Sequence, residues 1–323
     1  MKILVTGSAG FIASKTVEFL LRDKHRVAGV DDLNDSCDVR LKKHRLKNLQ
    51  SSRFRFYPAD IRDIRALKKI FLKEKPEAVA HLGARAGVRY SLENPFIYES
   101  TNILGTLNVL ELCKEHGVRK LVFASTSSVY AGTPAPFREN AGLKAPLSPY
   151  AATKLAAETL CGTYHHLYGM AMTVLRYFTV YGPQGRPDMS YFKFIQQIQE
   201  SQPLVIYGDG SQKRDFTYID DIAHGTVLAL GIKSGFRVIN LGGGKCYPLM
   251  SLIRLLERAL GKKARLRFTA AHKTDMKYTW ADNRLAQNIL HWKPRVNLQE
   301  GIGRTVEWHQ RHHSWLKTLS QVE

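Results

Sequence analysis

The chain has 323 residues, of which 44% are hydrophobic and 24% charged, so it can bury a full core and is not typical of a disordered protein. A net charge of +20 is typical of proteins that bind nucleic acids, but the basic residues are dispersed and no motif that reads DNA or RNA accompanies them. We therefore expect no nucleic-acid partner.

The sequence also lacks the features of membrane, secreted and metal-binding proteins. No apolar stretch approaches the length of a membrane span, and the first predicted strand begins at residue 2, which leaves no room for a signal peptide. The four cysteines are far apart and form no CxxC pair. We therefore expect a cytoplasmic protein without a membrane span or a metal site.

Short apolar segments alternate with segments of helical periodicity along the first half of the chain. These apolar segments predict strands at 2–6, 25–32, 53–60, 78–84, 120–125 and 171–178. Helices are predicted between them, including residues 100–116 and 148–169. Because strands that alternate with helices form parallel βαβ units, the predicted fold is α/β, with a doubly wound parallel sheet of the Rossmann type.

The sequence pattern changes in the second half of the chain. After the sequence GPQGRP at 182–187, the periodic segments become shorter and glycine and proline interrupt them more often. This change predicts a smaller α/β domain that binds substrate. We place the Rossmann domain at residues 1–178 and the substrate-binding domain mainly at 179–323, and we expect the chain to cross between the two.

The first chemical motif is the sequence TGSAGFIA at residues 6–13, between the first strand and the first helix. Gly7 permits a tight turn, Gly10 lets the backbone approach a pyrophosphate, and Ala13 stands where a third glycine allows close helix packing. Asp31 follows at the end of the second strand, where a carboxylate accepts hydrogen bonds from a ribose 2′-hydroxyl and repels a 2′-phosphate. The motif therefore predicts a dinucleotide site that favours NAD over NADP.

The second motif is the sequence YAATK at residues 150–154. Tyr150 and Lys154 are four residues apart and share one face of the predicted helix. The lysine ammonium, together with the positive nicotinamide ring, should lower the pKa of the tyrosine, which is about 10 in a free side chain. The tyrosine can then exchange a proton with a sugar hydroxyl. Four hydroxyl residues, 125–128, end the fifth strand at the edge of the sheet where ligands bind.

These motifs resemble those of the extended short-chain dehydrogenases/reductases, and within them the nucleotide-sugar epimerases. The similarity runs nearly end to end and is greatest to UDP-glucuronate 4-epimerases. It is strongest in the stretches LNDSCDVRLKKHRL, AGVRYSLENP, STSSVY, SPYAATK, RYFTVYGPQGRPDM and RDFTYIDDI. The chain departs from the family at Gly83, Arg85 and Gln184, where alanine, glutamine and tryptophan are common.

The resemblance implies a role for each residue of the site. Thr126 would bind the sugar 4-hydroxyl, Tyr150 would be the acid and base, and Lys154 its partner. The cofactor residues that it implies, with those of the glycine motif, are Gly7, Gly10, Phe11, Ile12, Asp31, Asp60, Ile61, Leu82, Ala84, Tyr150 and Lys154. The implied substrate residues are Arg89, Ser127, Ser128, Thr179, Arg186, Arg214 and Asp275.

The chemistry of the side chain supports the implied role of two of these substrate residues, and for one residue another role remains open. An arginine fork at Arg214 suits the diphosphate of UDP, and the carboxylate of Asp275 suits the two ribose hydroxyls of uridine. Arg186 adds a cation near the sugar. For Arg89, a surface ion pair remains the alternative to a binding role.

The resemblance also distinguishes between reactions. Related 4,6-dehydratases carry Asp-Glu directly after the residue equivalent to Thr126, and related decarboxylases carry a glutamate at the place of Ser128. This chain has Ser127 and Ser128, which leaves epimerisation at carbon 4. Thr179 stands where epimerases of neutral sugars have asparagine, so UDP-glucuronate, converted to UDP-galacturonate, is the predicted substrate.

Alternatives to this substrate and to catalysis remain open. UDP-glucose or UDP-N-acetylglucosamine could be the sugar nucleotide, or the chain could bind NAD and a nucleotide sugar without catalysis. The resemblance further implies a homodimer through the helices near residues 100–116 and 150–168. Leu155, Leu160 and Leu167 would offer part of a packing face for it.

Overall fold

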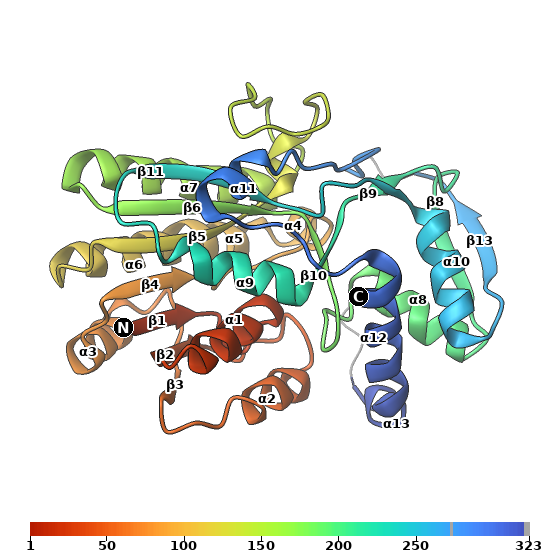
Figure 1. The fold of residues 1–323 in the computed structure, drawn as a ribbon, viewed down its shortest axis with the longest axis horizontal. Helices are drawn as coiled ribbons and strands as arrows, with labels where there is room; N and C mark the ends of the chain where they lie inside the picture. Colours follow the sequence, from red (N-terminus) through yellow and green to blue (C-terminus); the bar gives the residue numbers. More distant parts are fainter. Residues whose placement is uncertain (272–273, 320–323) are drawn as a thin grey trace.

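The structure, a computed structural model, describes residues 1–271 and 274–319. Its centre is a seven-stranded parallel sheet with the strand order β11-β6-β5-β4-β1-β2-β3, which confirms the predicted doubly wound fold (Figure 1). The strands are β1 (Lys2–Thr6), β2 (Arg26–Asp31), β3 (Phe54–Pro58), β4 (Ala78–His81), β5 (Lys120–Thr126), β6 (Ala171–Tyr177) and β11 (Phe236–Leu241).

Helices cover both faces of this sheet. One set comprises α1 (Phe11–Arg22), α2 (Val39–Lys47) and α9 (Ile219–Ala229), and α1 contacts both α2 and α9. The other set comprises α3 (Ile64–Glu74), α6 (Gly105–Glu115) and α7 (Pro149–Tyr168), and α6 lies between α3 and α7 and contacts both. Because side chains alternate along a strand, Ile3 and Val5 of β1 join the core under α1, whereas Leu4 joins the core under α3 and α6.

The segment that leads into α6 is helical in several short pieces. It consists of α4 (Tyr90–Glu93), α5 (Pro95–Glu99) and the π-helical turn η1 (Ser100–Leu104), which continues directly into α6. The helix predicted for residues 100–116 is therefore present, with a wider first turn. After β5 the chain makes the 3-10 turn η2 (Ser127–Tyr130).

The second half of the chain contributes a smaller α/β part beside the sheet (Figure 1). It contains two-stranded sheets that pair β7 with β10, β9 with β12 and β8 with β13. Its strands are β7 (Thr179–Tyr181), β8 (Pro203–Tyr207), β9 (Lys213–Arg214), β10 (Phe216–Tyr218), β12 (Tyr247–Pro248) and β13 (Arg265–Thr269). Its helices are α8 (Ser190–Gln199), α10 (Leu249–Leu260), α12 (Leu298–Arg311) and α13 (His313–Leu316). Helix α11 (Arg284–Leu290) packs instead on β11 and α9, in the central part.

The two halves of the sequence share the central sheet. Strand β11 lies after residue 179 but pairs with β6, and α9 packs on α1, so the chain returns to the Rossmann part from the smaller one. The boundary at 178/179 stays a prediction. In the part of the chain that the structure describes, every helix is too short or too polar to cross a membrane.

The turn between β1 and α1 depends on glycine at position 7. Gly7 has a φ of 70°, and a Cβ there would lie 2.8 Å from the Cα of Gly83, which follows β4. Real Cβ atoms do not approach a backbone carbon so closely, so the ends of β1 and β4 can meet only without a side chain at this position.

We expect Gly7→Ala to lower the free energy of unfolding more than Gly117→Ala does. Gly117 has a similar φ of 68°, but no atom lies within 4 Å of its Cβ position. The control should cost about 1 kcal/mol for the left-handed backbone alone. The clash should add roughly 1–3 kcal/mol at Gly7. Equal losses for the two variants in urea unfolding would contradict the packing argument.

Candidate active site

The carboxyl ends of the parallel strands meet at one edge of the sheet, and the glycine turn lies there. Gly10 is the N-cap residue of α1, and a Cβ on it would lie 2.8 Å from the carbonyl oxygen of Gly7. The turn therefore presents backbone rather than side chains to a ligand, and the N-terminus of the 12-residue helix α1 favours an anion there. The turn thus fits the pyrophosphate of a dinucleotide.

Asp31, at the end of β2, is buried beside this turn. Its carboxylate accepts hydrogen bonds from the backbone N–H of Ala9 at 3.1 Å and of Leu33 at 2.9 Å. The Nζ of Lys42, itself buried, lies 3.6 Å from the same carboxylate and donates to Asn34 at 3.0 Å. Asp31 is thus held beside the glycine turn, with the ammonium of Lys42 next to its carboxylate.

The other predicted cofactor residues lie along the same edge. Phe11 and Ile12 form the first turn of α1. Asp60 and Ile61 follow β3, and the carbonyl of Ile61 accepts a hydrogen bond from the amide of Asn108 at 3.0 Å. The remaining two, which follow β4, are Leu82 and Ala84.

Helix α7 presents Tyr150 and Lys154 to this edge. The helix starts where it does because Ser148 caps it, accepting a hydrogen bond from the N–H of Ala151 at 3.2 Å, and because proline occupies its first position. Lys154 is buried, and its Nζ lies 4.1 Å from the centre of the Phe123 ring. The two predicted catalytic residues therefore lie one turn apart beside β5.

Thr126 ends β5 and begins a cluster of hydroxyl groups. Its Oγ1 accepts a hydrogen bond from the N–H of Ser128 and donates one to the Oγ of Ser128, both at 3.1 Å. Thr126 pairs in register with Tyr177 of β6, and Thr179 lies two residues further along the chain. Thr126, Ser127, Ser128 and Thr179 thus share the carboxyl edge of β5 and β6.

The acidity of Tyr150 differs from the sequence-based expectation. Burial raises the pKa of Tyr150, while a hydrogen bond with Thr126 and the positive charge of Arg186 act in the opposite direction. Burial also lowers the pKa of Lys154, to about 8. Burial disfavours the charged forms of both side chains, so the lowered tyrosine pKa, which was expected from the lysine together with the positive nicotinamide ring, stays a prediction.

Tyr98 of α5 is a site residue that the sequence analysis missed. It is fully buried, its ring packs edge-on against Tyr150 with centroids 6.0 Å apart, and its hydroxyl donates to the carbonyl of Ala86 at 3.1 Å. Arg186 donates to the same carbonyl at 3.4 Å and to Asp188 at 2.5 and 3.0 Å. Tyr98 and Arg186 thus hold the loop after β4 against Tyr150. The sequence pattern could not predict the contact between Tyr98 and Tyr150, because it depends on packing between segments that are distant in the chain.

A buried ion pair, also missed, fixes α7 to the sheet. Arg176 of β6 donates two hydrogen bonds to the Glu158 carboxylate, at 3.0 and 2.6 Å, and Ser125 of β5 donates to the same carboxylate. Glu158 lies one helical turn after Lys154, so their shared face was a usable signal in the sequence. The pair joins α7, β5 and β6 next to Thr126.

The residues predicted for UDP lie where the loop after β4 meets the smaller part. Arg89 forms an ion pair with Asp275 at 3.0 Å, and its guanidinium lies 4.0 Å from the centre of the Tyr207 ring. Arg214 is half-buried, and burial lowers its pKa while the charge of Asp275 raises it. The ion pair expected as an alternative for Arg89 is therefore present, but its partner is itself a predicted substrate residue.

Strand β7 connects this region to the hydroxyl cluster. The N–H of Thr179 donates to the carbonyl of Asp215 at 3.1 Å, and Asp215 follows Arg214 directly. Asp215 is completely buried and accepts hydrogen bonds from the N–H groups of Gly243, Gly244 and Ala281. The carboxylate thus anchors Asp215 next to Arg214, and the backbone carbonyl of Asp215 connects this position to Thr179.

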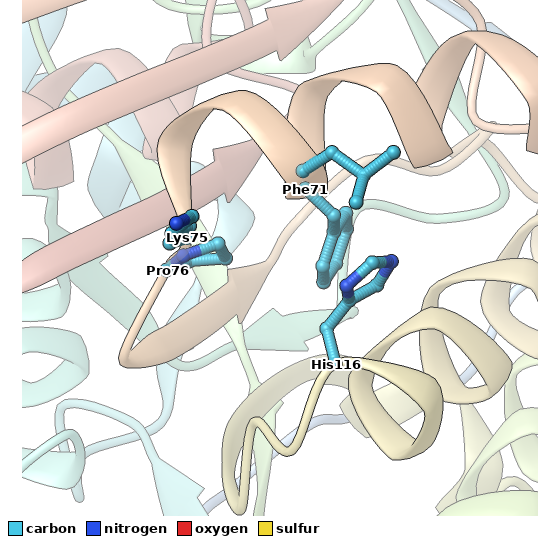
Figure 2. A pocket seen from close by; sticks show the side chains of 5 residues that line it. Phe71, Lys75, Pro76 and His116 are labelled. Carbon is cyan, nitrogen blue, oxygen red and sulfur yellow. The ribbon is translucent and has the colours of Figure 1, made fainter.

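A separate pocket of about 270 Å³ lies far from these residues. Figure 2 shows its lining by Phe71, Leu72, Lys75, Pro76 and His116. Residues 75 and 116 precede β4 and β5, so the pocket lies at the amino-terminal edge of the sheet. Ligands of doubly wound sheets bind at the opposite edge, so this pocket is not the candidate active site. Within residues 1–271 and 274–319, His, Cys, Asp and Glu form no group arranged to hold a metal.

A glycine turn after β1, an aspartate at the end of β2 and a tyrosine–lysine pair beside β5 together define a dinucleotide-dependent enzyme of the Rossmann class. Residues 3–242 match the model of the NAD dependent epimerase/dehydratase family. The chain belongs to this family, which confirms the family, the fold and the cofactor predicted from the sequence.

Three similar proteins have known or assigned activities. The chain is 54% identical over 318 residues to a UDP-glucuronate 4-epimerase of Thermodesulfobacterium geofontis, covering 98% of each chain. It resembles the crystal structure of the UDP-glucuronic acid 4-epimerase of Bacillus cereus with UDP-glucuronic acid and NAD, at a TM-score of 0.90, 39% identity and coverage of 96% and 99%. It also resembles the UDP-glucose 4-epimerase of Thermotoga maritima with UDP-glucose, at a TM-score of 0.89, 31% identity and coverage of 97% and 100%.

We expect Asp31→Ala to lose bound NAD faster than the parent and to accept NADP more readily. The variant removes the buried carboxylate and leaves Lys42 free to attract a 2′-phosphate. Asp32→Ala is the matched control, because Asp32 is the exposed neighbour. The measurement is cofactor content after dialysis, followed by reloading with NAD or NADP. An unchanged preference for NAD would exclude Asp31 as the ribose ligand.

Proposed function

We propose that the protein is an NAD-dependent 4-epimerase of UDP-sugars that interconverts UDP-glucuronate and UDP-galacturonate. The observation that carries the proposal is the convergence of Tyr150, Lys154 and Thr126 with Arg186 at the carboxyl edge of the sheet. The 54% identity to a UDP-glucuronate 4-epimerase supports it. The intact tyrosine–lysine pair argues against a module that binds nucleotide sugars without catalysis.

The residues of the site account for the proton transfers. NAD, when bound, supplies the group that accepts hydride from carbon 4 and returns it. As the phenolate, which the lysine ammonium and the positive nicotinamide ring would favour, Tyr150 takes the proton of the 4-hydroxyl when carbon 4 is oxidised. As the phenol it gives the proton back when carbon 4 is reduced, so the reaction has no net redox change. Thr126, which hydrogen-bonds Tyr150, orients the hydroxyl, and Arg186 counters the effect of burial on the tyrosine.

A uronate fits the groups around the sugar. Ser127, Ser128 and Thr179 offer short hydroxyl donors, and Arg186 offers a positive charge held in place by Asp188. Hydrogen bonds to a carboxylate are about twice as strong as those to a neutral group. The 4-keto uronate is a β-keto acid that loses carbon dioxide only when its carboxylate bond aligns with the carbonyl π system. Donors that hold the carboxylate off this alignment would protect it.

The UDP end is bound by different chemistry. Arg214 would bind the diphosphate and Asp275 the uridine ribose, with Arg89 paired to Asp275 and to the ring of Tyr207. Because Arg214 and Asp275 belong to the smaller part and Tyr150 lies on α7, the substrate would span the two parts of the molecule.

A panel of UDP-sugars tests the proposal. Wild-type protein loaded with NAD is incubated with UDP-glucuronate, UDP-glucose and UDP-N-acetylglucosamine, and the products are identified by NMR. We expect UDP-galacturonate from the first and slower or no turnover of the others. Tyr150→Phe should retain NAD but lower turnover a hundred-fold or more, because it removes only the hydroxyl that transfers the proton.

The outcomes of this panel separate the candidate functions. Preference for UDP-glucose would favour the alternative supported by the Thermotoga maritima neighbour and would leave only epimerisation at carbon 4. Turnover of Tyr150→Phe within a factor of about two of wild type would contradict the role of Tyr150. No turnover of any sugar nucleotide by NAD-loaded protein would leave the binding module as the function.

A second variant tests the choice of sugar. We expect Thr179→Asn to lower catalytic efficiency on UDP-glucuronate relative to UDP-glucose, because asparagine crowds a carboxylate and removes the hydroxyl donor. Losing one charge-assisted hydrogen bond costs roughly 1.5–3 kcal/mol, or about ten- to a hundred-fold in the ratio of efficiencies. Thr179→Ser retains the hydroxyl and should retain the preference. A ratio that is equal in all three proteins would remove Thr179 as its cause.

The proposal includes a cytoplasmic homodimer. Leu167 of α7 is 60% exposed, and Leu104 of η1 is exposed as well, which supports a packing surface on α6 and α7. Leu155 and Leu160 are instead half-buried against the protein's own core, so they contribute less than the sequence suggested. Sedimentation velocity measures the state directly, and a monomer at micromolar concentration would contradict the dimer.

A further inference from the structure

Arg45 is a buried cation that the proposed chemistry does not use. It lies in the basic run of α2, where the sequence suggests a solvated helix, yet only 2% of it is exposed. Leu41, Lys42 and Arg45 share the buried face of the helix. Burial lowers the pKa of Arg45, while Cys37 and the charges of the nearby Tyr191 and Asp31 act in the opposite direction.

The guanidinium of Arg45 reaches the loop that carries Arg186. Its Nε and Nη2 donate to the carbonyl of Gln184 at 3.0 and 2.7 Å, and Nη2 also donates to the carbonyl of Gly185 at 3.1 Å. Gln184 has a φ of 60°, a conformation that a residue other than glycine rarely adopts. The two hydrogen bonds to its carbonyl therefore hold a strained backbone in place.

The same guanidinium also reaches the cofactor turn. Its Nη1 donates to the carbonyl of Ala9 at 3.2 Å, and the N–H of Ala9 donates to Asp31. One planar group thus joins the turn that would hold the pyrophosphate to the residues immediately before Arg186. Because a guanidinium is rigid and its donors have fixed directions, a shift on one side is transmitted to the other.

Stability alone does not explain a charge at this position. Burying a cation has a large desolvation cost, and apolar residues of similar volume often stabilise a protein as well or better. The acceptors of Arg45 are main-chain carbonyls of two separate loops, which an apolar side chain could not align. The arrangement therefore favours a role in fixing the relative position of the loops.

We propose that Arg45 is a positioning residue that couples the two binding regions, so that a sugar nucleotide at the Arg186 loop stabilises NAD at the glycine turn, and the reverse. This inference rests on the proposed function. Coupling between two sites is reciprocal, so it can be measured on the release of NAD without following turnover.

The experiment compares the rate of NAD release from the holoenzyme alone, with UDP, and with UDP-glucuronate. In wild-type protein UDP-glucuronate should slow release roughly tenfold, and UDP, which lacks the sugar, should slow it less. Arg45→Met removes all the donors. Arg45→Lys keeps the charge but cannot reach both loops at once, so both variants should reduce the effect of the sugar to about twofold or less.

The matched control is Arg40→Met on the same helix. Arg40 binds Asp38 and the carbonyl of Thr318 and touches neither loop, so this variant should keep the wild-type effect. The inference is overturned if Arg45→Lys or Arg45→Met keeps the wild-type effect. It is also overturned, whatever the variants do, if UDP-glucuronate leaves NAD release from wild-type protein unchanged while turnover persists. Wild-type protein that neither retains NAD nor turns over UDP-glucuronate would instead contradict the proposed function.

Discussion

The ion pair between Glu158 and Arg176 is the interaction on which the geometry of the site depends. Both side chains are buried, and their two hydrogen bonds of 3.0 and 2.6 Å lock helix α7 onto strand β6. Ser125 donates to the same carboxylate, so strand β5 is tied to the helix at the residue before Thr126. A buried pair has a large desolvation cost, which excellent geometry and further hydrogen bonds offset. Here it brings Lys154, one turn away, into a fixed relation with the end of β5.

Burial explains why the site differs electrostatically from a simple pairing of tyrosine and lysine. The sequence places an ammonium near a phenol and predicts a lowered tyrosine pKa. In the structure the same burial that brings the two together disfavours the charged form of each, and the pKa of Lys154 falls to about 8. Arg186, which belongs to a loop distant in sequence, is the side-chain cation that acts on Tyr150. The charge that tunes the tyrosine therefore comes from tertiary structure.

The sequence could predict the features that depend on local spacing, but not those that depend on contacts between distant segments. The sheet, the glycine turn and the tyrosine–lysine face follow from local spacing, because strand and helix periodicities and turn chemistry act within a few residues. Arg45 and Tyr98 could not be assigned in the same way. Arg45 contacts a residue 139 positions away, and within the sequence RLKKHRLK only its spacing from Leu41 distinguishes it from the exposed cations Arg40, Lys43 and Lys47. Tyr98 meets Tyr150 across elements that only the folded chain brings together.

The proposed reaction makes opposite demands on the two ends of the site. Epimerisation requires the oxidised sugar to turn so that its other face meets the cofactor, while the nucleotide stays bound. Arginine forks and a carboxylate bind a diphosphate and a ribose in one orientation, and under the proposed function Arg214 and Asp275, with Arg89 paired to Asp275, would do so here. The hydroxyls of Thr126, Ser128 and Thr179 are short, and each can rotate to donate in several directions. A rotating sugar can therefore exchange one hydroxyl partner for another without leaving a buried group unpaired, whereas a single rigid fork at the sugar would favour only one face.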